Sequence, residues 1–307
     1  MAATALPDDA TPRVLSITPT SDAKNEYRVI TQFNVRGTPP IGPCWDTVLS
    51  VTVFAVHDSG RWLFANALPR ATRDWRHETI GPITFVVDPV LQFNRSRAAR
   101  SARFADSVSA MLGLGPPRPI TYFVNPTTDV ACEIQGITRI HPLGPQGGMA
   151  SQANRQVFSG NPTIGEGYLH ELAHVMVLPL MAGQSTLMAV EGIATWLGGT
   201  SGLDFADTQR DLASYLSNHP TITIDSIMNS TAPLQLKRGE SAEVVAGAVL
   251  SAMVFDEGGA AALKAFLAAG SFDALRASVT HALKRPWPSI AADWRTRALS
   301  AASTSAG

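Results

Sequence analysis

The chain has little that would direct it to a nucleic acid or to an acidic membrane surface. Only 16% of its 307 residues are charged, and 24 basic residues almost balance 25 acidic ones, which leaves a net charge of −1. This composition gives no electrostatic reason to bind phosphates. No run of about 18 to 20 uninterrupted apolar residues is present, so the sequence predicts no transmembrane segment.

Cysteine is almost absent, because Cys44 and Cys132 are the only two in the chain. They could form one disulfide in an oxidising compartment, or they could be two small buried residues in the cytosol. Neither stands at a spacing typical of zinc ligands. The sequence also lacks a Walker loop, a dinucleotide-binding fingerprint and a Gly-x-Ser-x-Gly elbow, so nucleotide binding and serine hydrolysis are not indicated.

The most informative motif is His-Glu-x-x-His, which runs from His170 to His174. If residues 164–178 are helical, the two imidazoles lie on one face of the helix at a spacing that suits one tetrahedral zinc ion. Glu171 then lies beside the open coordination position. The alternative for a bare motif is an amphipathic core helix whose histidines hydrogen-bond internally.

Start and stop signals predict that the motif lies inside this helix. Thr163 and Glu166 have the spacing of a capping box, and Pro179 would end the helix. A second helix is predicted over residues 185–197, followed by two glycines. The short turn between the helices would fold the second one back antiparallel to the first.

Glu191, on the second predicted helix, would then face the two histidines. Two imidazoles and one carboxylate make a catalytic zinc site, whose fourth position is left for water or substrate. The third ligand of a metzincin is absent, because Val177 and Leu180 stand where that family needs glycine and histidine. Thr195 lies one turn after Glu191, where its hydroxyl could steady a ligand or could simply be buried in the helix. The expected cofactor is one Zn²⁺ ion.

These residues resemble the gluzincin metallopeptidases, and most closely the bacterial proteins with a peptidase MA-like domain. The resemblance covers about residues 82 to 267. It rests on the segment from Gly165 to His174, on Glu-Gly-Ile-Ala-Thr-Trp from Glu191 onward, and on a later Ala-Gly-Ala segment at residues 246–248. It implies a zincin-type domain, in which a small sheet packs on the motif helix and a helical subdomain follows.

The resemblance also implies roles for four residues. His170, His174 and Glu191 bind zinc, and Glu171 is the general base. Zinc with three protein ligands lowers the pKa of its water toward about 7 and polarises a carbonyl oxygen, so a peptide bond can be attacked at neutral pH. We therefore expect a zinc metallopeptidase. An endopeptidase is slightly favoured, because no Gly-x-Met-Glu-Asn-type segment is present to anchor a free amine.

One departure from the family's pattern concerns the group that stabilises the oxyanion. Many gluzincins use a tyrosine or histidine from a later helix, often shortly before the Ala-Gly step, where this chain has Glu243 and two valines. Tyr215 and His219 are the nearest alternatives, although each also fits a plain position on a helix face or end. A second hypothesis follows, which is a zinc-stabilised binding or maturation factor with weak catalysis. A third is that the motif helix is only structural.

Peptide substrates of this clan usually lie beside an edge strand and add to the sheet through main-chain hydrogen bonds. Residues 154–159 are the candidate strand, and Gly147 and Gly148 before it would allow close backbone approach. An ordinary loop with a short strand is the alternative. A peptide or protein substrate is the partner that the sequence indicates.

The other predicted elements give an α+β fold with two domains. Residues 1–80 are predicted as an antiparallel β-rich accessory module, which resembles the later strands of an incomplete NTF2-like cone. Its strands are expected over residues 14–17, 27–35, 47–56 and 61–67, with a hairpin turn at residues 57–60. Residues 81–307 are predicted as the metallopeptidase domain, with the sheet and zinc helices in residues 81–200 and a helical subdomain in residues 201–307. Strands are expected over residues 83–87 and 120–125, on either side of a helix over residues 96–113. The helices expected after residue 200 run over residues 204–216, 241–255, 260–268, 272–283 and 290–299.

The N-terminal residues bear on localisation. Residues 1–13 lack the basic and apolar regions of a signal peptide, although an exported protein whose leader has been removed would look the same. Because the proteins that this chain resembles are mostly exported, we expect a periplasmic or extracellular location.

Overall fold

The computed structural model describes residues 11–20, 25–34, 48–139, 143–144, 146–181, 185–200, 202–230, 232 and 234–301. Chain packing divides the protein into two compact units. Unit 1 consists of residues 1–100 and 119–167, and unit 2 of residues 101–118 and 168–307. The predicted α+β class is confirmed, with an antiparallel sheet in the N-terminal part and a helical C-terminal region. The predicted domain boundary between residues 80 and 81 stays a prediction.

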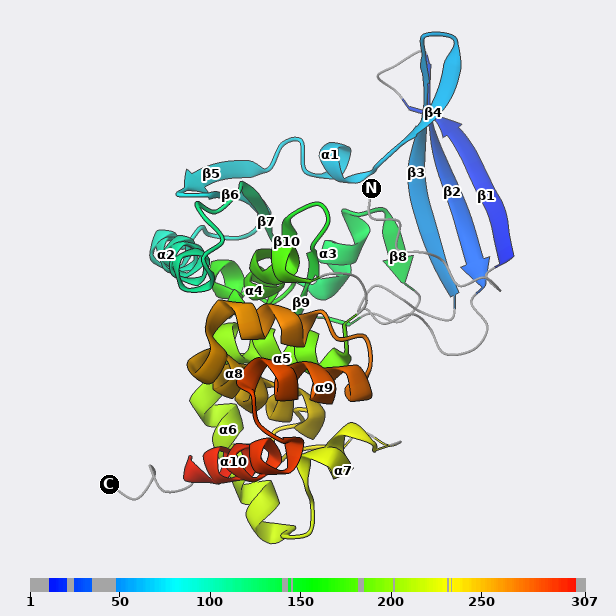
Figure 1. The fold of residues 1–307 in the computed structure, drawn as a ribbon. Helices are drawn as coiled ribbons and strands as arrows, with labels where there is room; N and C mark the ends of the chain where they lie inside the picture. The colour runs from blue at the N-terminus through cyan, green and yellow to red at the C-terminus, as the bar shows by residue number, and fades with distance from the viewer. Residues whose placement is uncertain are drawn as a thin grey trace. The chain divides into compact units, whose positions relative to one another are not determined.

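The N-terminal sheet belongs to unit 1, and Figure 1 shows its long strands side by side. Its strands β1 (Thr11–Pro19), β2 (Glu26–Asn34), β3 (Val48–Asp58) and β4 (Arg61–Ala65) follow one another in sequence order. Ser59 and Gly60 have φ angles of 49° and 79°, as a two-residue turn between β3 and β4 requires, so the predicted hairpin is confirmed. A fifth strand, β8 (Ile137–Arg139), pairs with β3 from far along the chain. The NTF2-like resemblance stays a prediction.

A second, mixed sheet of unit 1 has the order β5 (Arg76–Ile80), β6 (Ile83–Val87), β7 (Ile120–Val124), β10 (Gln156–Ser159) and β9 (Gly148–Ser151). The three inner strands are parallel, and the two outer strands are antiparallel to their neighbours. The strands predicted at residues 83–87 and 120–125 are confirmed as β6 and β7. Leu68 of α1 (Leu68–Ala71) and Ala131 of α3 (Thr128–Glu133) join Val86, Phe123 and Phe158 in its core.

The prediction that residues 154–159 form an edge strand is wrong. β10 is paired on both sides, with β7 and with β9, so β9 is the edge strand. Val157 and Phe158 are fully or almost fully buried, which is typical of an inner strand, whereas the Gly-Met-Ala-Ser of β9 has little β-propensity to reveal it in the sequence. The Gly160 N–H donates to the Gly147 carbonyl, so the backbone groups of Gly147 face β10. Because successive residues of an antiparallel strand face alternately toward and away from their partner strand, the N–H of Ala150 points away from β10, to the outer edge of the sheet.

Unit 2 is helical. Its later helices are α6 (Phe205–Asn218), α7 (Ile224–Met228), α8 (Ala242–Leu267), α9 (Phe272–Leu283) and α10 (Trp287–Ser300). All except α7 were expected. α7 is only five residues long and depends on a capping box between Thr223 and Ser226, so it has no apolar periodicity to predict it. The helices expected over residues 241–255 and 260–268 are the two halves of α8, which is kinked at Gly259 with a φ of 66°. Earlier in the chain, α2 (Arg95–Leu112) matches the predicted helix and crosses the boundary between the units.

In the described part of the chain, α8 alone has the length and apolar composition to span a membrane. More than half of its most apolar window is buried within the protein, and the positive φ at Gly259 kinks the helix. Trp294 of α10 is fully buried and donates its indole N–H to the Ala246 carbonyl of α8 at 3.0 Å. These are features of a core helix.

Cys132 is fully buried in α3 and is disulfide-bonded. Cys44, the only other cysteine of the sequence, lies outside the described residues.

Candidate metal centre

The His-Glu-x-x-His motif lies on α4 (Leu169–Val177), whose residues from His170 onward are all buried. A 3-10 turn at Leu178–Leu180, with Pro179 in its first positions, ends this helix where it was predicted to end. The predicted start is wrong. The helix begins at Leu169 and not near residue 164, because a 3-10 turn at Gly165–Gly167 with a φ of 53° at Gly165 precedes it.

The predicted capping box is also wrong. The Glu166 side chain is 2% exposed and accepts the backbone N–H of Asn94 at 2.7 Å, at the start of α2. The Thr163 N–H donates to the side chain of Asn161. Since Glu166 serves another helix, the local spacing of threonine and glutamate was misleading.

The second helix of the site is α5 (Leu187–Gly198). Thr186 caps its first turn by accepting the Ala189 N–H at 3.2 Å, and Gly199, with a φ of 74°, ends it. The end of α5 lies against the start of α4, since a Cβ on Gly198 would lie 2.4 Å from the carbonyl carbon of Leu169. This is the antiparallel arrangement that the sequence predicted.

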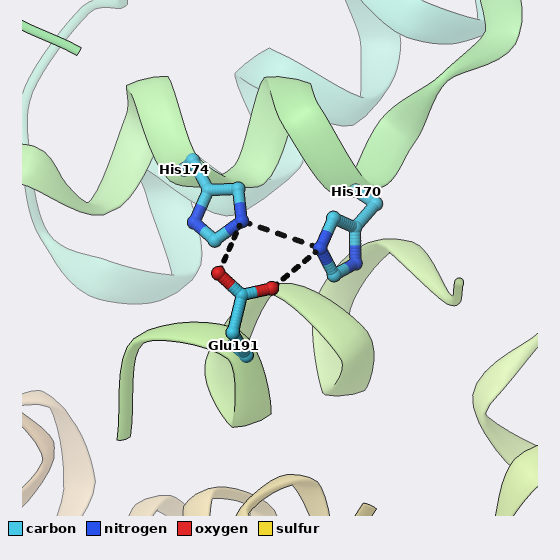
Figure 2. A group of neighbouring side chains, drawn as sticks. All are labelled: His170, His174 and Glu191. Atoms are coloured by element: carbon cyan, nitrogen blue, oxygen red, sulfur yellow. Dashed lines mark hydrogen bonds and ion pairs between the residues drawn. The ribbon is translucent and has the colours of Figure 1, made fainter. Parts of the chain in front are cut away.

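The two helices bring the three predicted ligands together, as Figure 2 shows. His170 Nε2 lies 3.2 Å from Glu191 Oε2 and 3.2 Å from His174 Nε2, and His174 Nε2 lies 3.5 Å from Glu191 Oε1. The rings are nearly perpendicular, at 84°. The side chains of His170 and His174 are 8% and 7% exposed, whereas Glu191 is 31% exposed, so the carboxylate is the more solvent-accessible part of the cluster.

The chemistry and spacing of this donor set fit a zinc ion. Bonds of about 2.0 to 2.1 Å in a tetrahedron place ligand atoms roughly 3.3 to 3.4 Å apart, which is close to the three separations found here. Two imidazoles and a carboxylate are also a donor set that zinc prefers. Without a cation, two ring nitrogens at 3.2 Å would share at most one hydrogen between them.

A hydrogen bond fixes the tautomer of His170. Its Nδ1 lies 2.7 Å from the Gly199 carbonyl, which can only accept, so the hydrogen is on Nδ1 and the lone pair of Nε2 points into the cluster. A backbone carbonyl behind a ligating histidine orients the ring and raises its basicity. The Nδ1 of His174 is buried and has no such partner in the described part of the chain.

The three side chains shift one another's protonation. Burial raises the pKa of Glu191, but the hydrogen bonds and charges of His170 and His174 outweigh it and hold that pKa well below its usual range. Burial lowers the pKa of His170, but the bond to Glu191 and the charges of Glu171 and Glu191 outweigh this effect and raise it. The cluster therefore attracts a positive charge, whether a proton or a metal ion.

Glu171 lies beside the cluster and not in it. Its side chain is buried, and burial raises its pKa although the neighbouring histidines oppose the rise. Within the described residues, no hydrogen bond to the Glu171 carboxylate is found. A carboxylate of raised pKa is suited to general base work near neutral pH.

The other residues singled out in the sequence do not join the site. Thr195 is fully buried, and its hydroxyl has no partner in the described part of the chain, so it does not hold Glu191 by a hydrogen bond. Tyr215 and His219 stack on each other at 4.4 Å at the end of α6, where His219 Nδ1 contacts the Tyr215 carbonyl. Both side chains thus have the ordinary roles of residues at a helix end, and neither is assigned as the oxyanion donor.

Gly198 and Gly199 matter more than the sequence indicated. They were expected only to end a helix, whereas Gly198 allows the close contact with α4 and the Gly199 carbonyl orients His170. Two consecutive glycines at the end of a ligand-bearing helix are the signal from which this close backbone approach could have been predicted. Tyr168, whose ring stacks on His170 at 6.2 Å, was not anticipated.

No known family model matches this chain, and no curated protein matches it. The resemblance to gluzincins therefore rests on the motif residues and on the geometry of their side chains.

Proposed function

We propose that this protein is a gluzincin-type zinc metallopeptidase that hydrolyses peptide bonds, with an endopeptidase favoured over an exopeptidase. The observation that carries the proposal is the convergence of the His170, His174 and Glu191 ligand atoms at tetrahedral spacing. A mixed sheet with an antiparallel edge strand in unit 1, and the two helices α4 and α5 in unit 2, are consistent with a zincin-type domain.

In this mechanism His170, His174 and Glu191 hold the metal, and the Gly199 carbonyl keeps His170 in the ligating tautomer. The bound ion would supply Lewis acidity toward water and a peptide carbonyl. Glu171 takes a proton from the attacking water and delivers it to the leaving amine, so that one carboxylate serves both proton transfers.

The exported location proposed for this protein has one supporting observation. Cys132 is disulfide-bonded, and disulfides persist mainly in oxidising compartments such as the periplasm and the extracellular space. A protein or peptide substrate is the partner that this proposal requires.

A catalytically weak, zinc-stabilised binding or maturation factor is the second candidate. It is favoured by one observation, which is that Tyr215 and His219, the nearest oxyanion donors that the sequence offered, stack on each other at the end of α6. Loss of a single oxyanion donor costs about 100- to 1,000-fold in turnover, so such a protein would bind zinc and cleave slowly or not at all.

Metal analysis and a peptide-library digest of the native protein and of Glu171→Gln separate these candidates. The metallopeptidase predicts about one zinc per chain in both proteins, with cleavage about 100- to 10,000-fold slower in the variant. Zinc in both proteins without cleavage under any condition would support the binding factor. A native protein that takes up no zinc would leave the motif helix as a structural element only.

A further inference from the structure

The N-terminal sheet has one side that is almost free of charge. Residues paired across neighbouring strands point to the same side of a sheet, so the register shows which residues share a face. One side carries two adjacent rows of apolar and aromatic residues, which are Ile17, Val29, Val53, Tyr27, Ala55 and Phe64. We call this side the apolar face. Among its paired residues, only Arg139 at the end of β8 has a fixed charge.

The opposite side of the sheet is more polar, and it is the side that α1 covers. Arg70 of α1 donates to the Glu26 carboxylate and lies 4.4 Å over the ring of Phe54, and both partners are on that side. An antiparallel sheet ordinarily packs its apolar face on a core and leaves its polar face in water. Here the apolar face is the one left open, with exposures of 56% for Val14, 64% for Ile17, 56% for Trp62 and 70% for Phe64.

Three rings on the apolar face form an ordered cluster at one end of the sheet. The Trp62 ring of β4 lies 5.5 Å from the Tyr27 ring of β2 at an angle of 60°, and 5.1 Å from the His57 ring of β3. Tryptophan and tyrosine are frequent anchors of protein interfaces. Because its neighbours already hold the Trp62 ring, little conformational freedom would be lost when a partner covers it.

The chemistry of the apolar face determines which partner fits it. A surface with so little charge has no complementarity for a nucleic acid, an anionic membrane or an acidic peptide. Two sheets pack face to face when their twists match, and their side chains then interdigitate in a layer about 10 Å thick. A second copy of this sheet has the same twist and the same apolar side chains. We propose that the apolar face is the interface of a homodimer, in which two copies pack sheet on sheet about a two-fold axis.

The size of the apolar face is also sufficient for a dimer. Four strands about 4.8 Å apart, with β1 and β2 each nine residues long at about 3.4 Å per residue, cover roughly 600 Å². Two copies would therefore bury roughly 1,200 Å², which is the lower end of the range for stable interfaces and exceeds most incidental contacts. An interface that uses the same face of both partners closes at two copies, so no larger assembly is expected.

The test measures the oligomeric state of the full chain by sedimentation equilibrium over a dilution series. It compares the native protein with Phe64→Lys and Ile17→Lys, which place a charge on the apolar face from two different strands. Leu63→Lys is the matched control, because Leu63 is 45% exposed on the same strand as Phe64 but pairs with Val56 on the opposite side of the sheet. All three positions are exposed, so lysine should not disturb the folded monomer, and circular dichroism checks this for each variant.

The native protein is expected to be a dimer. Each of the two lysines on the apolar face should weaken the dimer at least about 30-fold, as for the loss of an interface anchor, because the dimer would bury two unpaired charges. Leu63→Lys should dimerise within about threefold of the native protein.

Several results would overturn the proposal. A native protein that stays monomeric at every concentration would leave the apolar face to another partner, and a larger assembly would contradict the two-fold closure. A dimer of native strength in both variants of the apolar face would place the interface elsewhere, as would equal weakening in Leu63→Lys. If one of the two variants fails to fold, the other decides.

This proposal is independent of the proposed zinc site, whose ligands are on α4 and α5. Phe64→Lys should therefore contain as much zinc as the native protein in metal analysis. A native protein that dimerises through the apolar face but takes up no zinc would refute the proposed function and leave the dimer standing.

Discussion

Gly198→Ala is expected to reverse the ordinary effect of replacing a helical glycine. Alanine in a helix is favoured over glycine by about 0.5 to 1 kcal/mol, so at an open position the substitution stabilises the protein. At Gly198 a Cβ would lie 2.4 Å from the Leu169 carbonyl carbon and 2.5 Å from the His170 nitrogen. Since ordinary contact begins at 3.4 Å, the backbones of α4 and α5 must separate by roughly 1 Å.

The size of the effect follows from that separation. Overpacking of this kind costs about 1 to 3 kcal/mol, which exceeds the gain from helix propensity, so we expect a net loss of stability. The bond from His170 Nδ1 to the Gly199 carbonyl, now 2.7 Å, would be stretched or broken as the helices part. Loss of such an outer partner weakens metal binding by about 10- to 100-fold.

Urea unfolding with a chelator present, together with a zinc competition titration, measures both effects. Ser214→Ala is the control, because this exposed position on α6 gains helix propensity with no new contact. It should be slightly stabilising and bind zinc normally. A Gly198→Ala protein that is more stable than the native one and binds zinc equally well would refute the close contact between the helices.

Two further predictions concern other parts of the molecule. His174→Ala should reduce zinc from about one ion per chain to trace level in metal analysis, because it removes one of three protein ligands; full zinc occupancy would place the metal elsewhere. Glu26 pairs with Arg70, which lowers the pKa of Glu26 below 4.5, so this pair contributes stability above that pH and loses it as pH falls through the lowered value. Glu26→Gln should therefore cost about 0.5 to 1 kcal/mol at pH 7 and progressively less as the pH is lowered below 4.5 in thermal unfolding, and a cost independent of pH would contradict the pairing.

The candidate metal centre could be predicted from the sequence because its ligands are close together along the chain. Two histidines four residues apart share a helix face, and a short turn returns the second helix with Glu191 opposite them. The prediction failed where one side chain had two possible hydrogen-bond partners. The spacing of Thr163 and Glu166 fits a capping box, but Glu166 binds the N–H of Asn94, 72 residues away in the sequence.

The order of strands could not be predicted for the same reason. β10 and β9 are both short, and only pairing with β7, a non-local contact, decides which of them is the edge. Ser185 donates to the Leu267 carbonyl at the end of α8, a contact between residues 82 positions apart that no periodicity indicates. Local patterns predicted the elements, whereas long-range hydrogen bonds determined their neighbours.

The pairing of β8 with β3 has a consequence for synthesis and for protein engineering. During translation, the backbone of Leu49 to Val51 has no strand on that side until about 90 further residues have left the ribosome. A recombinant fragment that stops at residue 80 would keep this gap permanently, and unpaired strand edges promote aggregation. Any attempt to isolate the N-terminal sheet should therefore carry the chain through Arg139.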